Sequence, residues 1–267
     1  MRSLRTILLV VVFAVWLEPL GAQSGLAETS VSVVSSVHST DELVTIRDFG
    51  YIEISGDIRQ TDVASLAAAF PQARRTARSF THSGEPVVRV FVNSRGGEVL
   101  AAIQMGQLIR SQAAEVWVDK NAECSSACIF ILAGGVSRIA IPGAKLGIHR
   151  PFFRPEEFAG LSHELSQKKY SELAGGVKNY LAAMGVADTF YDAMIQVPSR
   201  KIEYITEAFA ESTRLLGDDP AYQEWQRAKD QKALGNERLE KLERYIDCVN
   251  GGKPDNECAH YLSGWNQ

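Results

Sequence analysis

The sequence predicts an α/β fold, in which a mainly parallel sheet has flanking helices and a helical C-terminal extension follows. Two observations support this prediction. Between Gly50 and His149, short apolar segments alternate with segments whose apolar residues recur at helical spacing. Beyond Pro155, only the helical pattern continues. Strands that alternate with helices favour parallel pairing, because each helix returns the chain to the same edge of the sheet.

The first elements follow from local pattern. The apolar segment Tyr51–Ile58 is expected to form a strand, and an alanine-rich helix should follow from about Thr61 to Arg78. The run V-V-R-V-F-V (Val87–Val92) predicts a second strand. The glycine pair Gly96-Gly97 then begins another helix, because apolar residues recur every three or four positions after it. Glu115–Val118 is the next expected strand.

After Val118, the expected elements are a short helix and two short strands, and then helices alone. Ser125–Ala133 is expected to be a helix, followed by two short strands around 138–141 and 147–149. The helices expected after them are 155–184, 187–195 and 206–216, with Thr206 as the cap of the last. Residues 220–248 predict an amphipathic helix with a weak point at Gly235-Asn236.

Residues 1–27 are typical of an export signal. Two arginines precede the apolar run Thr6–Leu17, and small residues favour cleavage after Ala22 or Ala27. The run is short for a spanning helix, and Glu18-Pro19 ends it, which favours cleavage over anchoring. A periplasmic or secreted protein is therefore expected, and a membrane-anchored one if the signal stays uncleaved.

We expect three further segments after the signal. Residues 28–49 form a leader, whose Ser/Val-rich part Glu28–Thr40 is either a strand or a loose segment. Residues 50–217 form the α/β domain, and residues 218–267 form the helical extension. The net charge of −4 and the pI near 5.8 give no basic surface for nucleic acid. No nucleotide-binding or zinc-protease motif is present, so neither a cofactor nor a metal is expected.

Four cysteines in an exported chain favour disulfides. Cys248 and Cys258 bracket the turn-rich segment N-G-G-K-P-D-N-E. A disulfide that closes this segment would stabilise the fold by about 2–3 kcal/mol. A metal site formed by these cysteines and His260 is a weaker alternative, because the spacing lacks a zinc pattern.

Three pieces of sequence carry the chemistry. Ser126 lies at a strand-to-helix turn, His149 lies at a later strand end, and the glycine pair Gly96-Gly97 follows a strand. They supply a nucleophile, a base and backbone N–H groups for an oxyanion. The alternative is a tight turn of small residues together with a structural histidine.

These motifs resemble the proteolytic subunit of the Clp protease, within the Clp/crotonase superfamily. The matching segments are Asn93-Ser94-Arg95-Gly96-Gly97, Ser126 with the apolar helix ending at Gly134, and Ile148-His149-Arg150-Pro151. The resemblance covers roughly residues 50–151. The signal and the cysteines around the serine are similar to those of exported bacterial Clp-like proteins.

The resemblance implies roles for further residues. The N–H groups of Gly97 and Ala127 are the expected oxyanion donors. Cys124 would lie before the helix, which favours a disulfide with Cys128 over two buried free thiols.

The family's third catalytic residue, an acid, aligns near Ile202, where this chain has no aspartate. Ser199 is the expected substitute, ahead of Glu203. A serine–lysine pair using Lys168, Lys169 or Lys178 ranks below the serine–histidine pair.

The resulting expectation is an exported Clp-like serine peptidase, a hydrolase that acts on peptides or unfolded polypeptides through a dyad or an incomplete triad. An ATP-dependent unfoldase is not expected as a partner, and homo-oligomers are compatible with the family. The alternative is a catalytically inactive binding or scaffold protein of the cell envelope. Export argues against an acyl-CoA enzyme.

Overall fold

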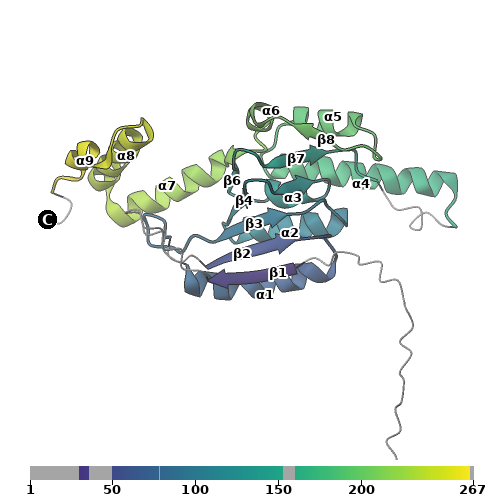
Figure 1. The fold of residues 1–267 in the computed structure, drawn as a ribbon, viewed down its shortest axis with the longest axis horizontal. Helices are drawn as coiled ribbons and strands as arrows, with labels where there is room; N and C mark the ends of the chain where they lie inside the picture. The colour runs from purple at the N-terminus through teal and green to yellow at the C-terminus, as the bar shows by residue number, and fades with distance from the viewer. Residues whose placement is uncertain (1–29, 36–49, 78, 153–159, 265–267) are drawn as a thin grey trace, which may run out of the picture.

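The computed structural model describes residues 30–35, 50–77, 79–152 and 160–264. The expected signal, residues 1–27, lies outside them, as does the expected leader apart from strand β1 (Ser30–Ser35). The described residues form a layered α/β body from which a helical arm extends (Figure 1). Among them, no helix combines the length and the apolar character that crossing a membrane requires.

Six strands form the main sheet in the order β1-β2-β3-β4-β6-β9. β2, β3, β4 and β6 pair in parallel, whereas β1 and β9 pair antiparallel at the two edges. The bounds are β2 Gly50–Ser55, β3 Arg89–Asn93, β4 Glu115–Val118, β6 Ser137–Ala140 and β9 Gly217–Asp218. The predicted mainly parallel sheet is therefore confirmed.

The two faces of the main sheet differ. Alternate residues such as Val90 and Val116 are fully buried. Between them, the half-buried rings of Tyr51, Phe91 and Trp117 form a row with centroids 5.0 and 6.0 Å apart. The alternation follows from the two-residue period of a strand, which places neighbouring side chains on opposite faces.

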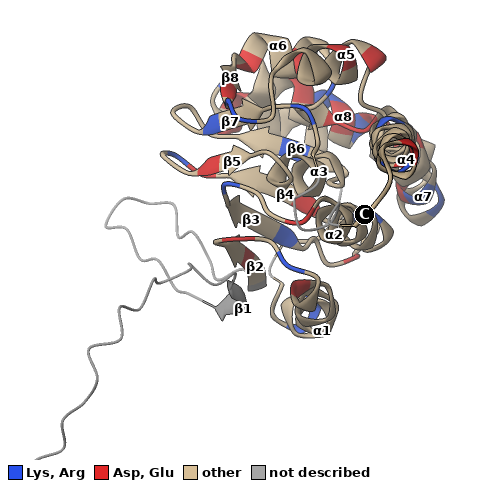
Figure 2. Ribbon diagram, turned by 90° about the vertical axis from the view of Figure 1, so that its right-hand side faces the viewer, with Lys and Arg blue, Asp and Glu red and all other residues tan. Residues whose placement is uncertain are grey.

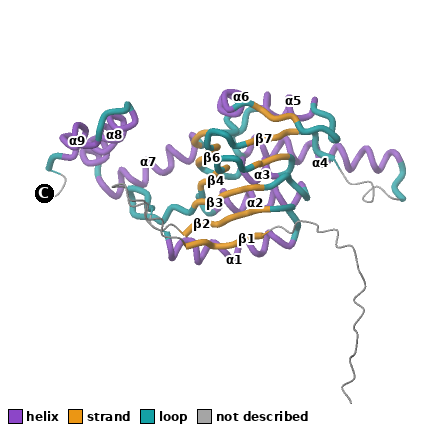
Figure 3. The backbone as a smooth tube through the Cα atoms, viewed as in Figure 1, coloured by secondary structure: helices purple, strands orange, loops and turns teal. Residues whose placement is uncertain are grey.

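The helices of the body lie mainly on one side of the main sheet (Figure 2). They are α1 Thr61–Thr76, α2 Val99–Ser111, α3 Cys128–Ala133 and α4 His163–Ala183, and α5 Asp188–Gln196 and α6 Glu207–Ser212 follow near the second sheet (Figure 3). α2 and α3 approach so closely that a Cβ built on Gly134 would lie 2.5 Å from the Cα of Gly106. The hydroxyl of Tyr180 on α4 donates to the carbonyl of Phe130 at 2.6 Å.

A second sheet holds the strands nearest the predicted site. β5 (Glu123–Ser125) and β7 (Lys145–Ile148) pair in parallel, and β8 (Glu203–Ile205) pairs antiparallel with β7. β5, β8 and β9 were not predicted, because two or three residues carry no periodicity.

The largest differences from the predicted helix boundaries are at three helices. The helix expected from Ser125 begins at Cys128, because Ser125 lies in β5 and Ser126 has a φ of +56°. The helix expected over 206–216 ends at Ser212, since Arg214 adopts a left-handed φ of +58°. The helix expected from Pro155 begins at His163, and residues 155–159 lie outside the described residues.

The C-terminal arm consists of helices that extend away from the body. They are α7 Pro220–Leu234, α8 Asn236–Asn250, α9 Asp255–Cys258 and a 3-10 turn, Ala259–Leu262. Gly235, with a φ of +80°, separates α7 from α8 at the predicted weak point. The sulfur atoms of Cys248 and Cys258 lie 2.04 Å apart, at bonding distance. The predicted pairing of these two cysteines is therefore confirmed at the level of distance.

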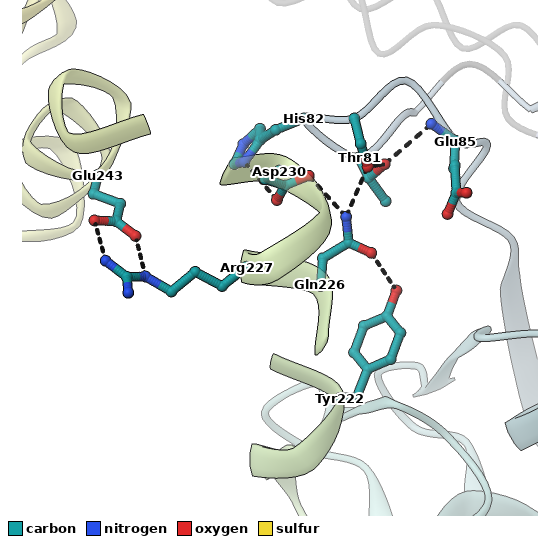
Figure 4. Close-up of polar contacts among 9 residues, drawn as sticks. Thr81, His82, Glu85, Tyr222, Gln226, Arg227, Asp230 and Glu243 are labelled. Atoms are coloured by element: carbon teal, nitrogen blue, oxygen red, sulfur yellow. Dashed lines mark hydrogen bonds and ion pairs between the residues drawn. The ribbon is translucent and has the colours of Figure 1, made fainter. Parts of the chain in front are cut away.

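Polar contacts attach α7 to the loop formed by residues 79–87 (Figure 4). The amide nitrogen of Gln226 donates to Ser83 Oγ at 3.0 Å and to Asp230 Oδ1 at 2.9 Å. His82 Nδ1 lies 3.5 Å from Asp230 Oδ2. A cleft of about 890 Å³ lies between this loop and the arm.

A buried charge cluster joins β6, α2 and the start of α7. Arg110 Nη1 lies 2.8 Å from Asp219 Oδ2, and Arg138 donates to the carbonyl of Met184 at 3.0 Å. Burial and the nearby Arg110 lower the pKa of Arg138 to about 10, although Asp219 opposes this shift. Burial alone would raise the pKa of Asp219, but the Tyr222 N–H and Arg110 outweigh it and lower that pKa.

Candidate active site

Ser126 occupies the turn between β5 and α3. Its φ of +56° lies in the left-handed region, which costs a residue with a side chain roughly 1 kcal/mol. Its N–H donates to the carbonyl of Gly147 at 2.9 Å, which fixes the turn against β7. Ser125 is fully buried, whereas Ser126 is partly exposed. Of these two serines, Ser126 is therefore the one that a substrate can reach.

A second cysteine pair spans this turn. Cys124 in β5 and Cys128 at the start of α3 have sulfur atoms 2.11 Å apart and Cα atoms 5.2 Å apart. The Cα separation suits a disulfide because Cys124 lies in a strand, not one turn earlier in the same helix. The pair therefore links the residues on both sides of Ser126.

The glycine turn packs directly on the serine turn. A Cβ built on Gly96 would lie 2.7 Å from the Cβ of Ser126 and 3.0 Å from the nitrogen of Ala127. Gly97 lies even closer to the backbone of Ile58. A Cβ built on Gly97 would lie 2.2 Å from the carbonyl oxygen of Ile58. The two glycines thus allow two backbone turns to touch.

This contact places Gly96, the neighbour of Gly97, against the nitrogen of Ala127, and both Gly97 and Ala127 have an unused donor. The N–H groups of Gly97 and Ala127 have no hydrogen-bond acceptor among the described residues. The N–H of Ile58 donates to the carbonyl of Gly96, and the carbonyl of Ile58 accepts from the N–H of Glu98. Neither bond uses the N–H of Gly97, which lies between these two residues. Two free N–H groups beside a serine form a geometry that can receive an oxyanion.

His149 follows β7 and is 7% exposed. β5 and β7 pair in parallel with Ser125 opposite Gly147, so Ser126 and His149 leave the sheet at the same edge. The ring Nδ1 lies 2.8 Å from the carbonyl oxygen of Arg150. A proton on Nδ1 would donate to this carbonyl and leave Nε2 free as a base. No hydrogen bond joins Ser126 directly to His149 among the described residues.

The loop that contains Ser199 is hydrogen-bonded to the residue after His149. The N–H of Arg150 donates to the carbonyl of Val197 at 2.9 Å, which brings the loop containing Ser199 beside β7. Within the described part of the chain, Ser199 forms no hydrogen bond with His149, whose Nδ1 faces the carbonyl of Arg150 instead. Ile202 packs on Gly147, two residues before the histidine.

The lysines of α4 are solvated. Lys168 and Lys169 are exposed, and Lys178 lies 3.7 Å from Asp188 and 5.7 Å from the ring of Tyr191. None of the three has a contact with Ser126 among the described residues.

Sequence reasoning missed Glu123 and Tyr204. The Glu123 carboxylate accepts a hydrogen bond from Ser125 Oγ at 2.7 Å and one from the Tyr204 hydroxyl at 3.1 Å. The second bond raises the pKa of Tyr204. The residues are 81 positions apart, and only the pairing of three short strands brings them together.

Comparison with known proteins gives a match to one family model. Residues 81–170 match the Clp protease family. The matched segment contains the glycine turn, the serine turn and His149, so the resemblance to Clp proteases is confirmed over this segment. No curated protein matches the chain.

A solved structure is also similar. A point mutant of ClpP1 from Listeria monocytogenes has 17% sequence identity and a TM-score of 0.47, over 62% of this chain and 88% of that chain.

Proposed function

We propose that this protein is a Clp-type serine peptidase, with Ser126 as nucleophile and His149 as general base. Its substrates would be peptides or unfolded polypeptide segments. The observation that carries the proposal is the pair of free N–H groups, on Gly97 and Ala127, beside a serine in a left-handed turn.

The chemistry follows from this arrangement. Ser126 Oγ attacks the peptide carbonyl carbon while its proton passes to Nε2 of His149. The N–H groups of Gly97 and Ala127 stabilise the negative carbonyl oxygen of the tetrahedral intermediate. The imidazolium then protonates the leaving amine, the C–N bond breaks, and an acyl-enzyme remains. Water, deprotonated by the same imidazole, attacks the ester carbonyl; the bond from this carbon to Ser126 Oγ then breaks, the imidazolium returns its proton to Oγ, and the acid is released.

The orienting group proposed for His149 is the backbone carbonyl of Arg150, with Ser199 as the nearest hydroxyl of the adjoining loop. A carbonyl fixes the tautomer, but it stabilises the imidazolium less than a carboxylate does. The expected rate is therefore lower than that of a complete triad.

We further propose export, on the pattern of residues 1–27. ATP is scarce outside the cytoplasm, so substrates would arrive already unfolded, without an ATP-dependent unfoldase. Homo-oligomers fit the Clp-type fold.

A specific observation favours a second candidate, a binding or scaffold protein that has lost catalysis. Neither a carboxylate on His149 nor a bond from Ser126 to the ring exists among the described residues. Such a protein would keep the fold and the peptide-binding surface but form no acyl-enzyme.

Labelling with a fluorophosphonate probe separates the two candidates, because only an activated serine reacts. The wild type should be labelled, and Ser125→Ala should still be labelled although more slowly, because it keeps both nucleophile and base; Ser126→Ala and His149→Ala should not be labelled, since nucleophile and base act as one unit. Labelling of Ser126→Ala equal to wild type, or no labelling of the folded wild type, would refute the peptidase.

A further inference from the structure

The side chain of Glu123 lies where three segments of the candidate site meet. Its Oε1 accepts from Ser125 Oγ at 2.7 Å and from the Tyr204 hydroxyl at 3.1 Å. Its Oε2 lies 3.5 Å from Arg95 Nε in the glycine turn. The Glu123 side chain is 18% exposed and Ser125 is fully buried, whereas Arg95 and Tyr204 are exposed, so the contact with Ser125 is the one shielded from water.

The backbone of Glu123 makes a fourth link. Its N–H donates to Asn93 Oδ1 at 3.1 Å, and its carbonyl accepts from the N–H of Ser94 at 2.6 Å. The N–H of Ser125 in turn donates to the carbonyl of Ser94 at 3.0 Å. Glu123 therefore joins the serine turn to the segment that carries the oxyanion donor Gly97.

Strand geometry explains how Tyr204 reaches Glu123. In the order β5-β7-β8, Ser125 lies opposite Gly147, and Gly147 lies opposite Tyr204. A Cβ built on Gly147 would lie 2.2 Å from Ser125 Oγ. Because Gly147 has no side chain, Ser125 Oγ occupies this space on β7, and the Tyr204 hydroxyl reaches the carboxylate on β5.

We infer that Glu123 is a positioning residue, which holds the Ser126 nucleophile in register with the Gly97 oxyanion donor. The inference rests on the proposed peptidase function. Glu123 touches neither substrate nor reacting atoms and acts through Ser125, the residue next to the nucleophile. Hydrogen bonds to an ionised carboxylate are stronger than neutral ones, and Glu123 accepts two and adds the Arg95 ion pair. Its loss would remove the side-chain links from Ser125 to Tyr204 and Arg95 and leave only backbone hydrogen bonds between the serine turn and the glycine turn.

The test measures the rate of fluorophosphonate inactivation over a range of probe concentrations, which separates the maximal rate constant from the probe's binding constant. Glu123→Ala should lower the maximal rate constant at least about tenfold with the binding constant unchanged, because a small displacement of a nucleophile is costly. Glu123→Gln should recover most of the rate, since its amide oxygen still accepts from Ser125 and Tyr204. Lys145→Ala is the matched control, since this exposed residue pairs with Glu123 across β5 and β7 and should leave the rate unchanged.

A second measurement does not depend on activity. Hydrogen exchange at the hydrogen-bonded amides of Ser125 and Ser126 should become faster in Glu123→Ala and Tyr204→Phe, while the melting temperature stays near that of the wild type. Unchanged exchange in both variants would overturn the inference, even if the wild type fails to label and the peptidase is refuted. A Glu123→Ala rate equal to wild type would also overturn it. If Glu123→Ala does not fold, Tyr204→Phe and Glu123→Gln carry the test.

Discussion

Gly97 shows how one missing side chain serves the candidate site. Its φ is +149°, and a Cβ at this position would lie 2.2 Å from the carbonyl oxygen and 2.6 Å from the nitrogen of Ile58. Real side chains do not tolerate such distances, so a substitution must displace the turn. The direction of the free Gly97 N–H depends on that turn.

We predict that Gly97→Ala lowers the rate of fluorophosphonate labelling about a hundredfold or more, the loss expected for one oxyanion donor. It should also destabilise the fold by about 1–3 kcal/mol, measured by urea unfolding. Gly84→Ala is the control, because Gly84 also has a positive φ but no atom within 4 Å of the built Cβ. Labelling of Gly97→Ala at the wild-type rate would remove Gly97 from the proposed oxyanion site.

At the scale of elements, helix α3 is fixed at several points. The Cys124–Cys128 pair links its first residue to β5, Gly134 at its end touches Gly106 of α2, and Tyr180 of α4 donates to the carbonyl of Phe130. A helix of six residues has little stability of its own, so these contacts must hold the serine turn that precedes it.

We predict that the Cys124→Ser/Cys128→Ser variant is labelled more slowly than wild type, because the serine turn loses its covalent link. Cys248→Ser/Cys258→Ser should be labelled at the wild-type rate, since that pair closes a loop in the distant arm. Non-reducing mass spectrometry of the wild type should find both disulfides. Equal rates in the two double variants would show that the first disulfide does not position Ser126.

Prediction from sequence succeeded where elements are long or patterned. β4 has the predicted bounds Glu115–Val118, and the break at Gly235 lies where the pattern weakens. It failed where tertiary contacts decide the structure. The strand at Glu203–Ile205 exists only because β7 pairs with it, and the hydrogen bond from Tyr204 to Glu123 depends on that pairing. The serine and glycine turns were found by motif, but the carbonyl beside His149 belongs to the backbone and leaves no mark in a sequence.

At the scale of the whole molecule, the Arg110–Asp219 ion pair joins the body to the start of the arm. Asp219 is 6% exposed, caps α7 by accepting from the N–H of Tyr222 at 2.8 Å, and lies near the buried Arg138. Its removal would leave two arginines without their shared carboxylate.

We predict that Asp219→Asn lowers the free energy of unfolding by roughly 3 kcal/mol at pH 7. The folded-state pKa of Asp219 is lowered, so its contribution is fully present above the unfolded pKa of about 4 and is lost as the pH falls through the folded value. The stability difference between wild type and variant should therefore shrink below about pH 4. Urea unfolding at pH 7 and pH 3 measures it, and a difference that is constant with pH would contradict this account.

The cleft between the arm and the body has a practical consequence. The loop at residues 79–87 and the body around Gln112 and Val136 form one side, and α7 and α8 form the other, so a compound in the cleft would contact both the body and the arm. A small molecule bound in this cleft would stabilise the contact between the body and the arm. At a hundred times its dissociation constant, such a compound would stabilise the docked state by about 2.7 kcal/mol. Fragment screening by thermal shift would thus yield chemical tools that lock the arm in place, without touching Ser126.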